Sequence, residues 1–346
     1  MRSLLLITGL LSSFGLATAT AAITENLNGL EPTKAEEIYV FPPSNPLWVE
    51  NLHRLPDGRL LLSTFSPDGI VYVLDPRSPA PRTPKEVAAL PNTTAELGIA
   101  ALGRDRYAIA TGRLNGATGL FFPGSGSIRV ILFPTGAQAA EQTEAIPIPD
   151  TQLLNGMTPL TSRPDVVLAA ESVEGRVVRV NTRTRTVKVA SSDPLLAPGA
   201  DAAVSLGVNG IKILRGHLYF TNSAQGLFAR YRIDSDGYQR GKVEVLARVG
   251  KATGFGDLLD DFALDSKTGD AYIARHNQAV LRVRYAKANG SWKVDVAVGP
   301  SSGVALRAPT AVIFEGKGDL FVSTAGRGPD GAVQAGANGG QVVGVY

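Results

Sequence analysis

A pattern of short apolar runs repeats six times along the chain, and this repeat limits the possible folds more than any other feature. The six units begin at Trp48, Ala95, Leu153, Gly207, Leu259 and Ala308. Each unit has an apolar run, a turn rich in Gly, Asp and Pro, a second β-type run, a turn of small residues and a third alternating run. The units begin roughly 45–60 residues apart, which is the spacing of propeller blades.

The repeat predicts an all-β fold, a six-bladed β-propeller of four-stranded antiparallel blades around a central channel. The chain of 346 residues is long enough for such a ring as a single domain. A β-sandwich would explain the alternation of apolar and polar residues but not the sixfold repeat. We expect the C-terminal segment GQVVGVY to pair with AEEIYVF near the N-terminus, because this pairing closes the ring and removes its exposed edges.

The N-terminal sequence MRSLLLITGLLSSFGLATATAA has the features of a secretory signal peptide: a charged start, an apolar segment and small residues at the cleavage site. We therefore predict a cleaved signal peptide at residues 1–22 and a propeller domain at residues 23–346, in an extracellular, vesicular or vacuolar protein. A membrane anchor is the alternative, but the apolar segment is shorter than the ~20 residues that span a bilayer. Asn92 and Asn289 stand in N-glycosylation sequons, in segments predicted to be loops.

Composition excludes several classes of function. The chain contains no cysteine, which excludes disulfides and thiol catalysis. The net charge is +3, and the basic residues are dispersed rather than gathered into a run that would follow a nucleic acid backbone. We expect a monomer that binds a small molecule, without nucleic acid and without a membrane span.

Polar residues recur at the openings of the six units. The first strand of a propeller blade lines the channel, so residues at its start face the channel mouth. Five of the six openings place a carboxylate or carboxamide just before the apolar run, and we expect these groups to converge on the axis. The openings are Glu50-Asn51, Glu96-Leu97, Asn155-Gly156, Asn209-Gly210, Asp260-Asp261 and Pro309-Thr310. Such oxygen donors suit calcium or magnesium rather than zinc or copper. The alternative is that each pair is an ordinary turn.

Other catalytic patterns are weak. His276 follows the second run of the fifth unit and is predicted to lie in a loop, and no Ser-His-Asp set or G-x-S-x-G elbow can be identified. The GSGS segment at residues 124–127 lacks the strand–loop–helix context of a phosphate-binding loop.

From Trp48 to Tyr346 the chain resembles the SMP-30/gluconolactonase/LRE-like family of six-bladed propellers, in WVENLHRLPDGRLLLS, VNGIKI, DDFALD and APTAVIFEG. The resemblance implies a metal site formed by Glu50, Asn209 and Asp260, with Asn155 as a fourth member. Two departures put lactone hydrolysis in doubt. Asp261 stands where the family usually has glycine, and the segment DTQLLN lacks a basic residue that lactonase relatives often carry.

Within this family, WVEN, NGI, DDFALD and PTAV are most similar to the secreted fungal branch, which includes the hetero-Diels–Alderases of tropolonic sesquiterpenoid pathways. This resemblance implies a pericyclase that joins a quinone-methide-type diene to a terpene alkene in the channel and needs no cofactor. We expect the catalytic groups to be Asp260, Asp261, Glu50 and Asn209, and the substrate-binding residues to be Trp48, Glu96, Asn155 and Met157. Core packing between blades is the alternative role for the apolar members of this set.

Two other functions remain open at this stage. One is a calcium-dependent lactonase, in which the metal polarises a carbonyl and activates water while Asp261 or Glu96 acts as base. The other is a secreted binding protein without catalysis, because propellers serve many functions on one scaffold.

Overall fold

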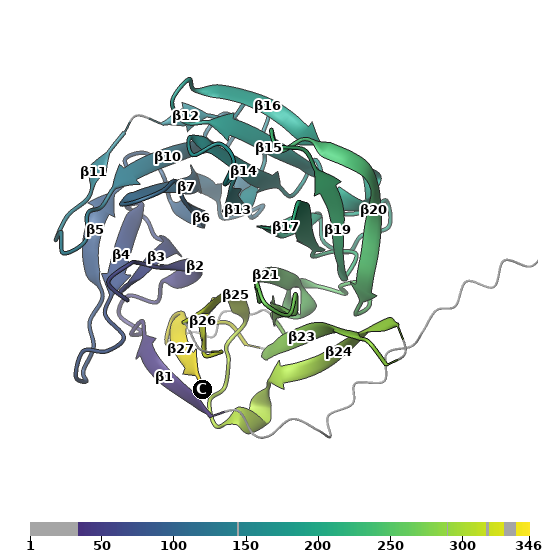
Figure 1. The fold of residues 1–346 in the computed structure, drawn as a ribbon. Coiled ribbons are helices and arrows are strands. Elements are labelled where there is room, and N and C mark those ends of the chain that lie inside the picture. The colour runs from purple at the N-terminus through teal and green to yellow at the C-terminus, as the bar shows by residue number, and fades with distance from the viewer. Residues whose placement is uncertain (1–33, 144, 289, 316–317, 329–336) are drawn as a thin grey trace, which may run out of the picture.

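The computed structural model describes residues 34–143, 145–288, 290–315, 318–328 and 337–346. They form six antiparallel sheets, the blades, arranged as a ring around a central axis (Figure 1). This confirms the predicted six-bladed propeller. The predicted signal peptide at residues 1–22 and the sequon residue Asn289 lie outside the described residues.

Each blade places one strand next to the axis and three further strands outside it, except that in blade 2 the outermost position is shared by the two short strands β11 and β12, which both pair with β10. Blade 1 contains β2 (Trp48–Arg54), β3 (Leu60–Phe65), β4 (Ile70–Leu74) and β5 (Lys85–Ala89); blade 2 contains β6 (Ala95–Ala101), β7 (Arg106–Gly112), β10 (Ser127–Leu132), β11 (Glu141–Gln142) and β12 (Ile146–Pro147); blade 3 contains β13 (Leu154–Pro159), β14 (Val166–Glu171), β15 (Arg176–Asn181) and β16 (Thr186–Ser191).

The second half of the ring repeats this order. Blade 4 contains β17 (Val208–Leu214), β18 (His217–Asn222), β19 (Leu227–Ile233) and β20 (Gln239–Arg248); blade 5 contains β21 (Leu259–Leu264), β22 (Ala271–Arg275), β23 (Ala279–Ala286) and β24 (Ser291–Val298); blade 6 contains β25 (Pro309–Phe314), β26 (Leu320–Thr324), β27 (Gln341–Val345) and β1 (Ala35–Val40). Outside the blades lie the hairpin β8 (Leu114–Asn115) and β9 (Leu120–Phe121), and the short 3₁₀ turns η1 (Pro194–Leu196), η2 (Phe255–Asp257) and η3 (Pro300–Ser302).

Blade 6 is built from both ends of the chain. Strand β1 pairs antiparallel with β27, so that Ala35 lies opposite Val345. The predicted pairing of AEEIYVF with GQVVGVY is therefore confirmed. The remaining edges of the innermost strands are joined to neighbouring blades by side-chain hydroxyls that donate to their carbonyls. These bonds run from Ser63 to Leu97 (2.6 Å), Ser172 to Val208 (2.7 Å), Ser223 to Leu259 (2.7 Å) and Thr310 to Val49 (2.7 Å). They satisfy buried carbonyls that the sheets leave unpaired.

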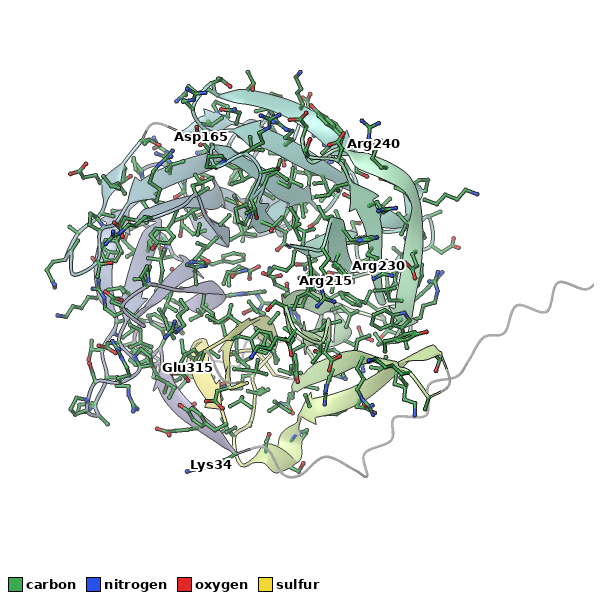
Figure 2. All side chains as sticks on the ribbon, viewed as in Figure 1. Lys34, Asp165, Arg215, Arg230, Arg240 and Glu315 are labelled. Carbon is green, nitrogen blue, oxygen red and sulfur yellow. The ribbon has the colours of Figure 1, made fainter. Side chains whose placement is uncertain are left out.

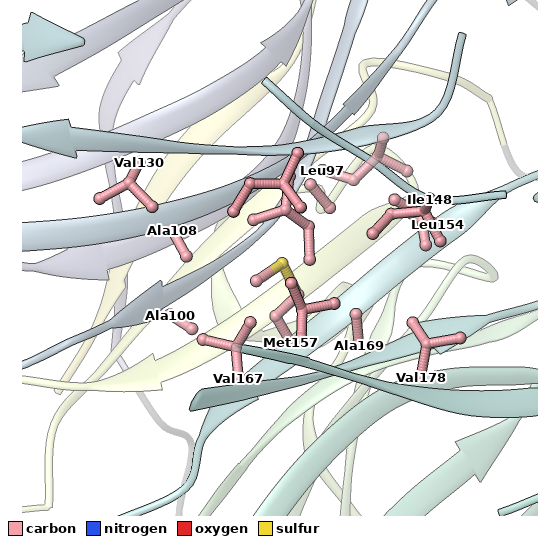
Figure 3. Close-up of a cluster of buried hydrophobic side chains, with 14 of the residues drawn as sticks. Leu97, Ala100, Ala108, Val130, Ile148, Leu154, Met157, Val167, Ala169 and Val178 are labelled. Carbon is pink, nitrogen blue, oxygen red and sulfur yellow. The ribbon is translucent and has the colours of Figure 1, made fainter. Parts of the chain in front are cut away.

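The hydrophobic core lies between successive blades. One cluster joins blades 2 and 3 and contains Met157, which is 2% exposed, among Leu97, Ala100 and Val167 (Figure 3). Charged side chains such as Asp165 and Arg240 project from the outer rim instead (Figure 2). The described residues contain no helix that is long and apolar enough to cross a membrane.

Candidate functional site

The innermost strand of every blade has a β-bulge near its start. The ladder shifts between Val49 and Asn51, Glu96 and Ile99, Leu154 and Met157, Val208 and Ile211, Leu259 and Phe262, and Pro309 and Ala311. A bulge leaves residues unpaired and redirects their side chains. The first bulged residues form one ring around the axis: Glu50, Leu97, Asn155, Asn209, Asp260 and Thr310.

In blade 2, the residue at the ring position differs from the one that we expected. There the ring position belongs to Leu97, and Glu96 is still paired with Thr111 in the ladder. The Glu96 side chain is fully buried and accepts a hydrogen bond from the Thr93 hydroxyl (2.6 Å). The structure therefore places Glu96 away from the predicted cluster, whereas Glu50, Asn209, Asp260 and Asp261 do come together.

The Asn-Gly pairs are not turns, because both lie inside innermost strands. Their glycines are required by the close approach of neighbouring strands. A Cβ atom at Gly156 would lie 2.7 Å from the carbonyl oxygen of Asn209, and one at Gly210 would lie 2.8 Å from the Cα atom of Asp261. Contacts under 3.0 Å with backbone atoms cannot be relieved by moving a side chain. The Asn-Gly pairs are therefore explained by close packing of neighbouring innermost strands and not by turns. This packing holds the ring of bulged residues together.

We expect Gly156→Ala to lower the free energy of unfolding by about 2–3 kcal/mol, because the added methyl group must displace strand β17. Gly116→Ala is the matched control, since nothing lies within 4 Å of its Cβ position. Urea unfolding of the two variants measures the difference. Equal stability of the two variants would contradict the proposed close contact.

Asp261 occupies the bulge position that is glycine in blades 2, 3 and 4, and it connects three blades across the axis. Its carboxylate accepts hydrogen bonds from the Asn51 amide of blade 1 (2.9 Å) and the Lys212 ammonium of blade 4 (2.5 Å). The Lys212 ammonium also lies 5.4 Å from the centre of the Phe262 ring. Asp261 is therefore a buried and neutralised carboxylate, and it is not a solvated turn residue.

Asp260 forms a pair with His276, for which the sequence predicted only a loop position. The Nε2 atom of His276 lies 2.8 Å from Oδ2 of Asp260, and Nδ1 lies 2.8 Å from the carbonyl oxygen of Phe255. A carbonyl can only accept, so Nδ1 carries a proton. The short contact between Nε2 and Oδ2 then requires a second proton between them, on either atom. The pair is thus a buried, neutral acid–base dyad.

Glu50 lies within the electrostatic influence of this dyad. Burial raises the pKa of Glu50 well above its ordinary value, and the neighbouring carboxyl groups of Asp260 and Asp261 raise it further. Burial also raises the pKa of Asp260, although the hydrogen bond from His276 opposes this effect. Among the residues that the structure describes, Glu50 Oε2 and Asn209 Oδ1 are buried without a hydrogen-bond partner. We call Glu50, Asn209, Lys212, Asp260, Asp261 and His276 the axial cluster.

Aromatic groups flank the axial cluster. The Trp48 ring stacks on Phe65 with centroids 4.9 Å apart and meets the His276 ring edge-on at 6.3 Å. The Arg327 guanidinium lies 4.7 Å from the centre of the Trp48 ring, and burial lowers the Arg327 pKa. Trp48 of blade 1 thereby connects the dyad of blade 5 to the segment that follows β26 in blade 6.

The other predicted residues are placed as follows. Asn155 belongs to the polar ring, and it is 6% exposed. Met157 packs in the core between blades 2 and 3, as the core-packing alternative expected. Asn92 is exposed in the loop before β6. Lys212 was missed by the sequence reasoning, although its spacing from Gly210 puts both residues on one face of β17.

The axial cluster has some of the chemistry of a cation site. The unpartnered oxygens of Glu50 and Asn209 are hard donors of the kind that Ca²⁺ prefers, and Asp260 is the third ligand implied by the resemblance. His276 and Lys212, however, already make close hydrogen-bonding contacts with Asp260 and Asp261, respectively. Within the described ranges, no group of three or more His, Cys, Asp or Glu side chains is arranged to hold a metal. The oxygens of Glu50, Asn209 and Asp260 thus suit Ca²⁺ chemically, but the side chains of His276 and Lys212 compete with a metal for the aspartate oxygens.

No family model matches the chain. The chain is 25% identical over 256 residues to a Sarocladium schorii protein provisionally named a hetero-Diels-Alderase, covering 68% of this chain and 62% of that protein. A second protein of the same provisional name, from a Phoma species, is 23% identical over 292 residues, covering 78% of this chain and 80% of its own length. The chain thus aligns with less than two thirds of the Sarocladium protein.

Solved structures show the same fold. A luciferin-regenerating enzyme superposes with a TM-score of 0.62 at 13% identity, covering 91% of this chain and 95% of that one. Regucalcin of Agrobacterium tumefaciens, described as a calcium-binding protein, superposes with a TM-score of 0.55 at 18% identity, covering 88% and 92%. The predicted resemblance to these propellers and to the hetero-Diels-Alderases is confirmed.

Proposed function

We propose that this propeller, being similar in sequence to two proteins named hetero-Diels-Alderases, is itself a pericyclase of this type. Its substrates would be a quinone-methide-type heterodiene, formed by loss of water from a hydroxymethyl precursor, and a terpene alkene. The observation that carries the proposal is the His276–Asp260 dyad beside Glu50. These groups hold protons in a buried setting without a strong nucleophile.

The first step is the loss of water. A proton from the dyad passes to the hydroxyl oxygen of the precursor, the C–O bond breaks, and water leaves. The ring hydroxyl of the precursor gives its proton back to the dyad, so the products are the heterodiene and one water molecule. A dyad that both donates and accepts suits this exchange, because general acid–base catalysis needs both proton states near neutral pH.

The second step is the cycloaddition. One C–C and one C–O bond form as three π bonds become one, and no proton is transferred. The enzyme contributes by holding the two reactants in contact and by stabilising charge at the heterodiene oxygen. A protonated Glu50 is a suitable hydrogen-bond donor to this oxygen, because its raised pKa keeps the carboxyl group neutral. The aromatic Trp48 and Phe65 offer an apolar surface to the alkene.

The test is turnover of a hydroxymethyl-tropolone precursor with a humulene-type alkene by the purified protein. We expect an adduct with the summed mass less one water, formed faster than in buffer and with one handedness. A racemic adduct at the background rate would contradict the proposal. The segment at residues 1–22 supports action in the secretory pathway, and comparison of secreted and intracellular fractions tests this point.

A calcium-dependent lactonase is the second candidate, because Glu50 Oε2 and Asn209 Oδ1 are buried donors without partners. When bound at Glu50, Asn209 and Asp260, the metal would polarise a lactone carbonyl. Under the pericyclase proposal, chelation by EDTA should leave turnover unchanged within about twofold, because the protons are held by the protein's own groups. Stoichiometric calcium, measured by elemental analysis, together with loss of turnover on chelation would instead support the lactonase.

A further inference from the structure

A second polar pocket lies over blade 2, apart from the axial cluster. It has a volume of about 350 Å³, which falls in the range of small-ligand sites. Its lining comes from the loop before β6 and the loop after β7, so it opens on the face of the ring where the innermost strands begin. The described lining residues include Arg113, Arg129 and the GSGS segment at residues 124–127, and none of them is acidic.

Arg129 has no ion-pair partner at this pocket among the described residues. One of its terminal nitrogens donates to the carbonyl of Pro91 (2.7 Å), while its Nε atom is buried without a hydrogen-bond partner. Burial lowers the Arg129 pKa, and the nearest acidic influence is Glu96, whose own pKa is raised by burial. Among the described residues, no carboxylate lies within ion-pair distance of Arg129. Partial burial of a guanidinium without an ionised partner has a free-energy cost, and this cost favours the binding of an anion beside it.

Arg113 adds a second cation to the same lining. Its guanidinium lies 5.2 Å from the centre of the Phe122 ring, which leaves its planar edge available for hydrogen bonding. It also forms no ion pair with any described carboxylate. Two guanidinium groups on one pocket match the geometry of an oxyanion, because each can donate two parallel hydrogen bonds to a carboxylate or phosphate group.

We propose that this pocket binds a small oxyanion, either a carboxylate or a phosphate group, between Arg113 and Arg129. The site is independent of the pericyclase proposal, because none of its residues belongs to the axial cluster. The Gly-Ser segment contributes a compact wall rather than a phosphate-binding loop: the Ser125 hydroxyl is already bonded to Phe122 and Arg113. Specificity would therefore rest on the two arginines.

The test is isothermal titration calorimetry with inorganic phosphate and, separately, with acetate, in a chloride buffer of constant ionic strength. We expect saturable binding of at least one probe, weakened at least about tenfold by Arg129→Gln, since charge-assisted hydrogen bonds are lost. Binding of phosphate alone identifies a phosphate site, and binding of acetate alone identifies a carboxylate site. Arg113→Gln is the second variant, because this exposed side chain can be changed without disturbing the core.

Arg248→Gln is the matched control, because it removes the same charge from an exposed position on β20 outside the pocket. Binding that is unchanged in Arg248→Gln and reduced in both pocket variants supports the proposal. The absence of saturable binding with both probes would overturn it. Equal binding by all three variants would overturn it as well, since the affinity would then come from overall charge.

Discussion

His276→Ala is expected to reduce turnover in the proposed pericyclase reaction by about 10²–10⁴-fold, the range that general acid–base groups contribute. Without the imidazole, Asp260 loses the hydrogen bond that opposes the effect of burial on its pKa, so its carboxyl group holds its proton more tightly and donates it less readily. The rate of adduct formation at saturating precursor is the measurement. His217→Ala is the control, because this ring lies outside the axial cluster, next to the Arg215 carbonyl and the Tyr219 ring at the start of β18 in blade 4.

The His276–Asp260 dyad leads to a second prediction, which concerns a double variant. If His276 and Asp260 act as one unit, the double variant His276→Ala/Asp260→Ala should be no slower than either single variant. Asn209→Ala should also lose activity while keeping the fold, because its amide lies beside the dyad. Full activity in Asp260→Ala and Asn209→Ala would remove the axial cluster from the mechanism. Additive losses in the double variant would show that the two residues act separately.

Glu96→Gln is expected to stabilise the protein by an amount that grows with pH. Burial raises the pKa of Glu96 from 4.5 to about 8 in the folded state. Between these two values the unfolded chain has lost the proton that the folded protein still holds, so stability falls as pH rises. Each pH unit corresponds to about 1.4 kcal/mol, which predicts a gain for the variant of about 3–5 kcal/mol by pH 8.

The measurement is urea unfolding of Glu96→Gln and the natural protein at pH 5 and pH 8. Glutamine keeps an oxygen for the Thr93 hydroxyl, so the variant retains that hydrogen bond while removing the titration. A stability difference that is the same at both pH values would contradict the raised pKa. Turnover should be little affected, because Glu96 lies outside the axial cluster.

The fold could be predicted because it depends on features that repeat along the amino-acid sequence. The apolar openings and the turns are short local patterns, and the two terminal segments form a simple pair. The innermost strands of the six blades begin within one residue of the predicted starts. Glu50, Asn209 and Asp260 were found for the same reason: each precedes an apolar run at one register.

The rest of the site depends on long-range geometry. His276 approaches Asp260 because the turn after β22 lies beside the start of β21, where the His276 amide donates to the Leu258 carbonyl (3.0 Å), and Lys212 reaches Asp261 from another blade. Glu96 was misplaced because its bulge begins one residue later than that of Glu50. A register difference of one residue is invisible to a pattern of apolar runs, yet it decides which side chain faces the axis.

The shared sixth blade has a consequence for how the molecule is made. Strand β1 is the first of the blade strands to be synthesised but has no partner until β27 is complete, and their pairing is supported by a hydrogen bond from Gln341 to Glu37 across 304 residues (2.6 Å). During synthesis the early blades therefore form an unclosed ring, in which strand β1 and the last completed strand have unpaired edges. The ring can close only when β27 has been synthesised. Premature termination would therefore yield an unclosed, association-prone intermediate rather than a smaller functional protein.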